Sequence, residues 1–452
     1  MTIRHRWLVV ASVAFSLLPR ASYAGMMTPC SAPAMFPGAS VTVFVFPYVD
    51  HTSDESAKTE SVVGTDLAGL IQTDTLLAIS RLGNVAAIRL LGNPQQCQPA
   101  RVLNDLISGF GSTQTSRNGV VLVWGRIFKV DDELYVQSYA SFQRFRLQDP
   151  GEMIELPFGG ATLAGRLASQ TVAFAPRHVS NADLEQIKAR YAQANIVHDR
   201  PDESSPGKPL IMMFPNAQRP AYYLTETRGD WIHIKAQSGQ DGWLLARAMV
   251  GDELLTTRLP EMKFVEGVAG YFAVRASPAE GTAALASKAL ATFEAAPSSS
   301  AADEPHAVSK QLRGLIRLLA GRQSDGAFSD ASALFTEAAT LVPSNAAAGN
   351  LATITALYRD WRDRDATIDF DATANRFWES IGSDPADQTA LTNCWVLFNV
   401  AQSAEFRSRF RFSEKVGPSD LAAKTAAFKT VQVSGKPVAL VQAKPVVPWP
   451  AP

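Results

Sequence analysis

The sequence lacks the motifs on which most enzyme classes depend. Its six histidines include no pair at a metal-ligand spacing. It contains no Gly-x-Ser-x-Gly turn and no Ser-x-x-Lys signature with its companion motifs. The first predicted strand is followed by residues 51–55, His-Thr-Ser-Asp-Glu, and not by a glycine-rich phosphate loop. We therefore predict a protein that is not an enzyme and has neither a metal nor a cofactor.

Cysteine is also scarce, with three residues in the whole chain. Cys30 and Cys97 each lie just outside a predicted strand of one domain, so we predict that they form a disulfide in an oxidising compartment. Cys394 lies in an apolar helical stretch, where the simplest prediction is a buried free thiol. A catalytic thiol needs a nearby base, and His306, the closest histidine in sequence, is distant.

The first 24 residues indicate export. Arg4 and Arg6 precede an apolar segment, residues 7–18, which is too short to span a bilayer, and Ser22 and Ala24 fit a small-x-small cleavage site. We predict a signal peptide cleaved after Ala24 and a periplasmic or secreted protein, at most peripheral to a membrane. An uncleaved anchor is the alternative.

The charge of the remaining chain is nearly balanced. Removing residues 1–24 takes three arginines and no acid, which leaves 39 basic against 43 acidic residues and no basic run. This balance gives no electrostatic reason to expect a nucleic-acid partner. The remaining 428 residues suggest about three domains.

Residues 222–245 carry the most specific pattern. Two strand-like segments flank Arg228-Gly229-Asp230, the turn before Trp231, and a second turn at 238–242 precedes Trp243. This pattern resembles the bacterial SH3 domain, with its Gly-Asp-Trp turn followed by Gly-Trp-Leu. The resemblance implies a small β-barrel over residues 209–250 that binds a cell-wall glycopeptide or an envelope protein.

The aromatic residues of this segment are the candidate ligand-binding residues, Tyr222, Tyr223, Trp231 and Trp243. Aromatic grooves stack on a peptide or a sugar face while polar edges form hydrogen bonds. The alternative is that the two tryptophans only pack the barrel, which applies best to Trp243. A further alternative makes the barrel a spacer between domains.

Residues 25–198 are predicted to form an α/β sheet domain. Residues 41–46 and 84–91 are strand-like, residues 65–81 and 99–110 are helix-like, and residues 120–145 form a hairpin around Asp131-Asp132. The strand 43–47 before the helix at 66–71, and the later hairpin, resemble the N-terminal domain of the Tol-Pal protein TolB and related envelope assembly proteins.

The rest of the chain is predicted to be mainly helical. Residues 199–208 are polar and proline-rich and are assigned to a linker, and residues 251–433 to an all-α domain. Ala331, Phe335, Ala338 and Pro343 resemble the second helix and exit of a tetratricopeptide repeat, which implies helical repeats; an ordinary helical bundle is the alternative. Residues 434–452 are predicted to be a proline-rich disordered tail.

The predicted fold class is therefore multidomain α+β: an α/β sheet domain, a small SH3-like β-barrel and a helical-repeat-like domain. The predicted function is a non-enzymatic cell-envelope adaptor, with a wall ligand on the barrel and a protein partner on the helices. The alternative is a wall-targeted hydrolase with an unrecognised active site, for which Asp369 and Asp371 are the acids to test. The oligomeric state stays open.

Overall fold

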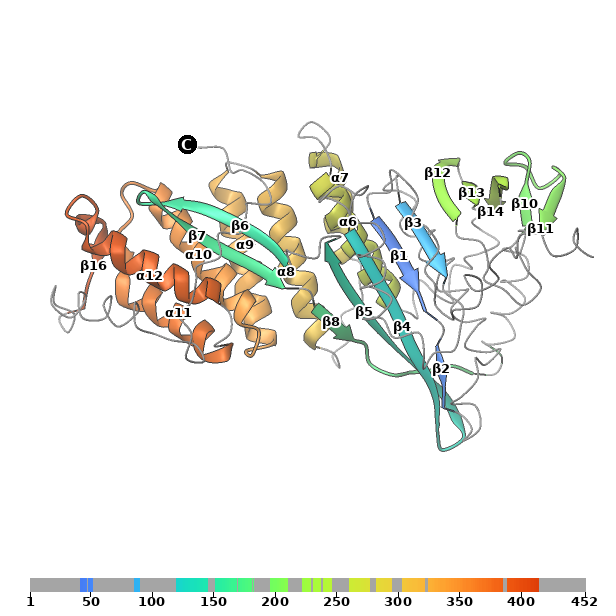
Figure 1. Cartoon of the computed structure of the whole chain (residues 1–452), viewed down its shortest axis with the longest axis horizontal. Coiled ribbons are helices and arrows are strands. Elements are labelled where there is room, and N and C mark those ends of the chain that lie inside the picture. The colour runs from blue at the N-terminus through green and yellow to red at the C-terminus, as the bar shows by residue number, and fades with distance from the viewer. Residues whose placement is uncertain are drawn as a thin grey trace, which may run out of the picture.

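The structure of the chain is a computed structural model (Figure 1). It describes residues 41–46, 48–51, 85–89, 119–144, 151–168, 170–180, 182, 196–209, 222–228, 231–236, 239–245, 260–276, 282–294, 303–321, 324–384 and 388–413. The predicted helices at 65–81 and 99–110, the segment 1–24 and the tail 434–452 lie outside these residues.

The described residues form an α+β protein with a helical C-terminal region. The centre of the main sheet is β1 (Val41–Val45), which lies parallel to both β3 (Val85–Arg89) and β4 (Gly119–Val130). Every residue of β1 is buried, as expected of a continuous run of β-branched and aromatic residues in a central parallel strand. The short β2 (Val49–Asp50) pairs with the far end of β4. The predicted strand at 41–46 is confirmed.

The predicted hairpin is confirmed as β4 and β5 (Glu133–Arg144). Asp131 and Asp132 have φ of 50° and 65°, the left-handed conformation that a tight two-residue hairpin turn requires. The pairing register runs through Gly125 without a shift, so this glycine forms no bulge. Its role is to leave room for the Tyr48 ring, which a Cβ at position 125 would approach to 2.0 Å.

The SH3-like segment belongs to the same sheet. Its strands are β12 (Tyr222–Arg228), β13 (Trp231–Ala236) and β14 (Asp241–Leu245), which pair in antiparallel order, and β12 also pairs with β3. Across the described residues the sheet is open, with the strand order β11-β10-β14-β13-β12-β3-β1-β4-β5-β8, and no closed barrel is formed. The finger-like edge strands lie to the right in Figure 1.

The predicted linker at 199–208 is also part of this sheet. It connects and completes a hairpin of β10 (Ile196–His198) and β11 (Gly207–Pro209), and β10 pairs with β14. Its proline and polar residues form a turn in which Ser205 N–H donates to the Asp202 carbonyl at 3.0 Å. The proline-rich, polar composition is typical of a turn. It did not reveal that β10 and β11, on either side of this turn, pair with each other.

Seven helices of the described chain follow the sheet. The bounds are α6 (Pro260–Ala276), α7 (Thr282–Glu294), α8 (Asp303–Ala320), α9 (Asp325–Leu341), α10 (Ala346–Arg362), α11 (Phe370–Ser383) and α12 (Gln388–Gln402). They lie within residues 251–433, which were predicted to be all-α. The short strands β15 (Ile368–Asp369) and β16 (Phe410–Arg411) also pair in this range, so the region is mainly but not entirely helical. α6 packs on β4 and β5, while α8 to α12 pack each against the next. Small residues permit this close packing: Ala331 and Ala338 in α9 are fully buried, and a Cβ at Gly314 would strike the Phe335 ring.

A second hairpin, which the sequence analysis did not predict, joins the sheet region to the helices. β6 (Gly151–Phe158) and β7 (Ala161–Ala168) turn through Gly159 and Gly160, both with positive φ. The hairpin extends away from the main sheet and lies across the helices, with β7 against α10 and α12 (Figure 1). The chain then returns through β8 (Gln170–Ala173) and β9 (Arg177–His178), which both pair with β5.

The middle of β7 is held by two buried asparagines. Asn393 of α12 accepts from the Ala164 N–H at 2.7 Å and donates to the Ala164 carbonyl at 2.6 Å, as a neighbouring strand would. Asn350 of α10 donates to the same carbonyl at 3.1 Å and accepts from Asn393 at 2.8 Å. Both asparagines are fully buried. Next to Ala164, a Cβ at Gly165 would come within 2.5 Å of Leu351, so glycine permits the approach.

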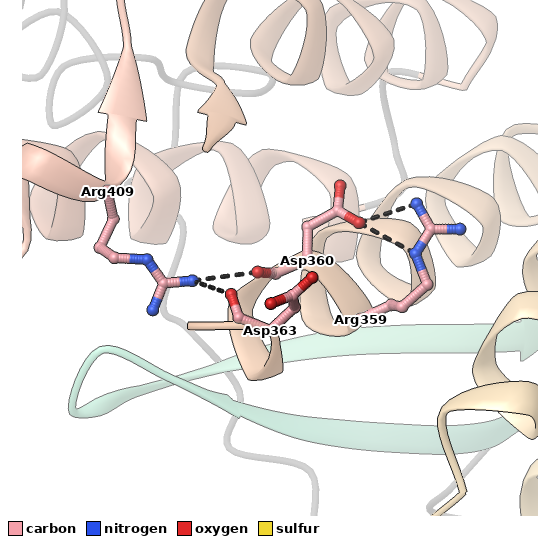
Figure 2. A network of polar contacts seen from close by, with 4 residues as sticks. All are labelled: Arg359, Asp360, Asp363 and Arg409. Atoms are coloured by element: carbon pink, nitrogen blue, oxygen red, sulfur yellow. Dashed lines mark hydrogen bonds and ion pairs between the residues drawn. The ribbon is translucent and has the colours of Figure 1, made fainter. Parts of the chain in front are cut away.

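The tip of the hairpin packs at the C-terminal end of α10. The Phe158 ring lies 4.5 Å from the Trp361 ring, and the Arg409 guanidinium covers Trp361 at 5.0 Å. Arg409 also donates to the carbonyls of Asp360, Trp361 and Asp363 at 2.7–3.1 Å. Figure 2 shows Arg409 reaching the last turn of α10, with the hairpin beside it. A cation bound to the last carbonyls of a helix stabilises that end.

We expect Asn393→Ala to lower the free energy of unfolding by about 3 kcal/mol, because it leaves the Ala164 N–H and the Asn350 side-chain oxygen without their partner, while the Ala164 carbonyl keeps only the Asn350 donor. Urea unfolding measures the change. Asn399→Ala on the same helix is the matched control, since Asn399 donates only to the Trp395 carbonyl of its own helix. Equal losses for the two variants would contradict the role given to Asn393.

Candidate functional site

The predicted ligand site lies on one face of β13 and β14. Side chains alternate along β13, so that Ile232 and Ile234 are buried while Trp231 and His233 share the other face. The register pairs His233 with Trp243 and His198 with Trp243. The sheet therefore brings both tryptophans and two histidines to the same face.

Ring contacts organise this face. The His198 ring meets Trp231 edge-on at 5.1 Å, and the His233 ring meets Trp243 edge-on at 4.8 Å. The Arg228 guanidinium lies 5.1 Å from the centre of the Trp243 ring, within cation–π distance. Each tryptophan thus has a histidine beside it, and Trp243 also has a cation over its face.

Burial separates the two tryptophans. Trp243 is 6% exposed, as expected of a packing residue. Trp231, at the start of β13, is partly exposed. The backbones of Tyr222 and Tyr223 pair with Ala87 and Ala86 of β3, where β12 joins the parallel strands of the sheet. The structure does not describe the side chains of these two tyrosines.

Hydrogen bonds fix the two histidines. His233 Nε2 lies 2.9 Å from an Asp241 carboxylate oxygen, and Lys235 Nζ lies 3.7 Å from the other oxygen. His198 Nδ1 lies 2.9 Å from the Ser205 carbonyl in the β10–β11 turn. The turn therefore orients the imidazole that contacts Trp231. An aromatic face with oriented polar groups at its edge can bind a ligand.

The two acids of the hydrolase alternative have structural partners. Asp369 precedes α11 and accepts from the Ala372 N–H at 3.0 Å and from Arg411 at 2.8 Å. Asp371 accepts from the Ser413 N–H at 2.7 Å. The Ala372 N–H, followed by Arg411, holds the pKa of the Asp369 carboxyl below its ordinary value. A glycosidase acid needs the opposite shift. Asp369 caps α11, and both carboxylates hold the segment after α12, through Arg411 and the Ser413 N–H.

The remaining sequence candidates are cysteines. Cys394 is a free, fully buried thiol in α12, as predicted. Cys30 and Cys97 lie outside the described residues, so their disulfide stays a prediction. Within the described ranges, no group of three or more His, Cys, Asp or Glu residues could hold a metal ion, and no helix is long and apolar enough to cross a membrane.

Comparison with known proteins adds no family. No protein-family model, no curated protein and no solved structure matches the chain significantly. The resemblances to bacterial SH3, TolB and tetratricopeptide sequences therefore stay predictions, and the functional argument depends on the geometry of the site.

We expect Asp369→Asn to make the protein less stable at neutral pH and to leave it unchanged in strong acid. The folded-state pKa of Asp369 is lowered, so its carboxylate stabilises the fold above the ordinary pKa of about 3.9, and this contribution is lost as the pH falls through the folded value. Asparagine keeps the helix cap but not the charge. Urea unfolding from pH 7 down into strong acid, below the folded-state pKa, measures the difference.

Glu405→Gln, at an exposed position in the same region, is the control and should change stability little across this range. A difference between Asp369→Asn and the natural chain that is independent of pH would contradict the assignment.

Proposed function

We propose that this protein is a non-enzymatic adaptor of the cell envelope, exported by its first 24 residues, that binds a cell-wall glycopeptide or an envelope peptide on the Trp231 face. The observation that carries the proposal is the difference between the tryptophans: Trp243 is packed, while Trp231 is partly exposed beside an oriented His198. Rigid, partly exposed aromatic rings with polar groups at their edge suit sugar and peptide ligands.

The proposed binding role does not require the closed barrel of an SH3 domain. Strands β10 to β14 supply the two Gly/Trp turns and the aromatic face that the resemblance implies. They do so as the edge of a larger sheet. The same strands therefore both bind the ligand and connect the site to the rest of the molecule.

The proposed protein partner binds the helices on the side away from the hairpin. β7 already covers the face formed by α10 and α12. A groove of about 680 Å³ remains between α9, α10 and α11, with Arg376 and Glu379 at its α11 side. Small residues such as Ser332, Gly349 and Ser380 line it, so a partner side chain can approach the helix backbones.

We expect Trp231→Ala to reduce binding to isolated cell wall at least severalfold while the protein stays folded, because the ring is partly exposed. Trp243→Ala should instead lower the free energy of unfolding by about 3–5 kcal/mol, because it empties a packed site. Cosedimentation with cell wall and urea unfolding measure the two effects.

Trp378→Ala is the matched control for cosedimentation, because Trp378 is 42% exposed on α11 and lies outside the proposed site. Unchanged sedimentation of the Trp231→Ala variant would count against the proposal, as would no sedimentation of the natural chain.

A further inference from the structure

A second aromatic surface lies on the β4–β5 arm. The tip of this hairpin projects beyond the sheet (Figure 1), while β2 pairs with β4 at Arg126 and Ile127 and β9 pairs with β5 at Tyr135 and Val136. Trp124 and Tyr139 stack at 5.8 Å with their planes 16° apart, and Phe128 and Tyr135 stack at 5.9 Å with planes 21° apart. We call these four residues the aromatic ladder.

A polar pair lies between the two stacked pairs and holds them in place. Arg126 Nε donates to Gln137 Oε1 at 2.9 Å, and the Tyr139 hydroxyl donates to the same oxygen at 3.1 Å. Gln137 donates in turn to the Phe174 carbonyl at 3.1 Å, and the Arg126 guanidinium lies 5.0 Å from the Phe128 ring centre. The rings are thus preorganised by hydrogen bonds as well as by stacking.

The ladder lies on the outer face of the arm. The opposite face of the same strands is buried through Ile127, Val136 and Ala140, at 0%, 2% and 1% exposure. The four ladder residues are only partly buried, and Val130, further along the same face, is 47% exposed. A continuous, partly exposed aromatic face of this kind usually marks an interaction surface.

Charge narrows the choice of ligand. The tip next to the ladder carries three exposed acids, Asp131, Asp132 and Glu133, against one exposed base, Lys129, while the exposed Arg126 is bonded to Gln137. These acids repel a polyanion and favour a ligand that carries lysine. Flat, preorganised aromatic rings favour proline-rich segments in the polyproline II conformation, because such a segment loses little entropy on binding.

We propose that the aromatic ladder binds the proline-rich segment at residues 436–452 of this chain. This segment contains Lys436 and Lys444 and the run Pro445-Val446-Val447-Pro448-Trp449-Pro450. In a polyproline II helix, Pro445 to Trp449 span about 12 Å. Four residues of a strand separate the two stacked pairs, which is about 13 Å.

Chain length permits the contact. The described chain ends at Ser413, with 39 residues after it. At 3.3–3.6 Å per residue, these can extend to at most roughly 140 Å, in the same molecule or toward a neighbouring copy.

The test replaces Trp449 in the full-length protein with photoreactive p-benzoylphenylalanine, followed by irradiation and peptide mapping. We expect crosslinks from this position to residues 124–139. The double change Phe128→Ala and Tyr135→Ala should lower their yield by up to about tenfold, because it removes one stacked pair. The double change Phe128→Tyr and Tyr135→Phe keeps the rings and should keep the yield, which separates ring contact from damage to the fold.

Trp378→Ala, remote from the ladder, should leave the yield unchanged. Crosslinks that map to other segments, or a yield that the alanine changes do not alter, would overturn the proposal. So would binding of soluble wall glycan fragments that is lost in the alanine variant while crosslinks to residues 124–139 are absent, because the surface would then be a sugar platform.

Discussion

The pairing of the Ala164 backbone with the Asn393 side chain connects the two halves of this molecule. A strand edge normally satisfies its N–H and C=O groups with another strand. Here one amide side chain supplies both partners, and Asn350 completes the network from the neighbouring helix. Because both asparagines are fully buried, the hairpin cannot leave the helices without leaving their amide groups unpaired or exposed to water.

This connection determines which surfaces can bind other molecules. The hairpin covers the α10–α12 face, so the helical region offers the groove on the α9–α11 side. The sheet offers the Trp231 face at one edge, and the β4–β5 arm offers the aromatic ladder. The contacts of Phe158 with Trp361 and of Ala164 with Asn393 hold the hairpin against the helices and so fix these surfaces relative to one another.

Much of the local structure could be predicted from the sequence. The β-branched run at 41–46, the Asp131-Asp132 turn and the periodic helices from 260 onward are signals within one element. Gly159-Gly160 is a local turn signal for the β6–β7 hairpin, although the hairpin was not predicted. Nothing local in the sequence indicates that the hairpin packs on the helices. Ala164 and Asn393 are 229 residues apart, and a polar residue in a helix carries no local sign of a distant strand. For the same reason, the sequence did not reveal that β12 pairs with β3.

The candidate site, too, was predictable from local signals only in part. The Gly/Trp turns indicated the Trp231 face, while the difference in burial between Trp231 and Trp243 depends on His198, Arg228 and their strands. The four aromatic residues of the ladder lie four positions apart on each strand, at 124 and 128 and at 135 and 139, so the sequence already indicates that they share one face of the hairpin. Native-state hydrogen exchange tests the central claim most directly. We expect the Ala164 amide to exchange together with the most protected amides of α10 and α12. Exchange of Ala164 on the time scale of exposed strand edges, with the helices still protected, would contradict it.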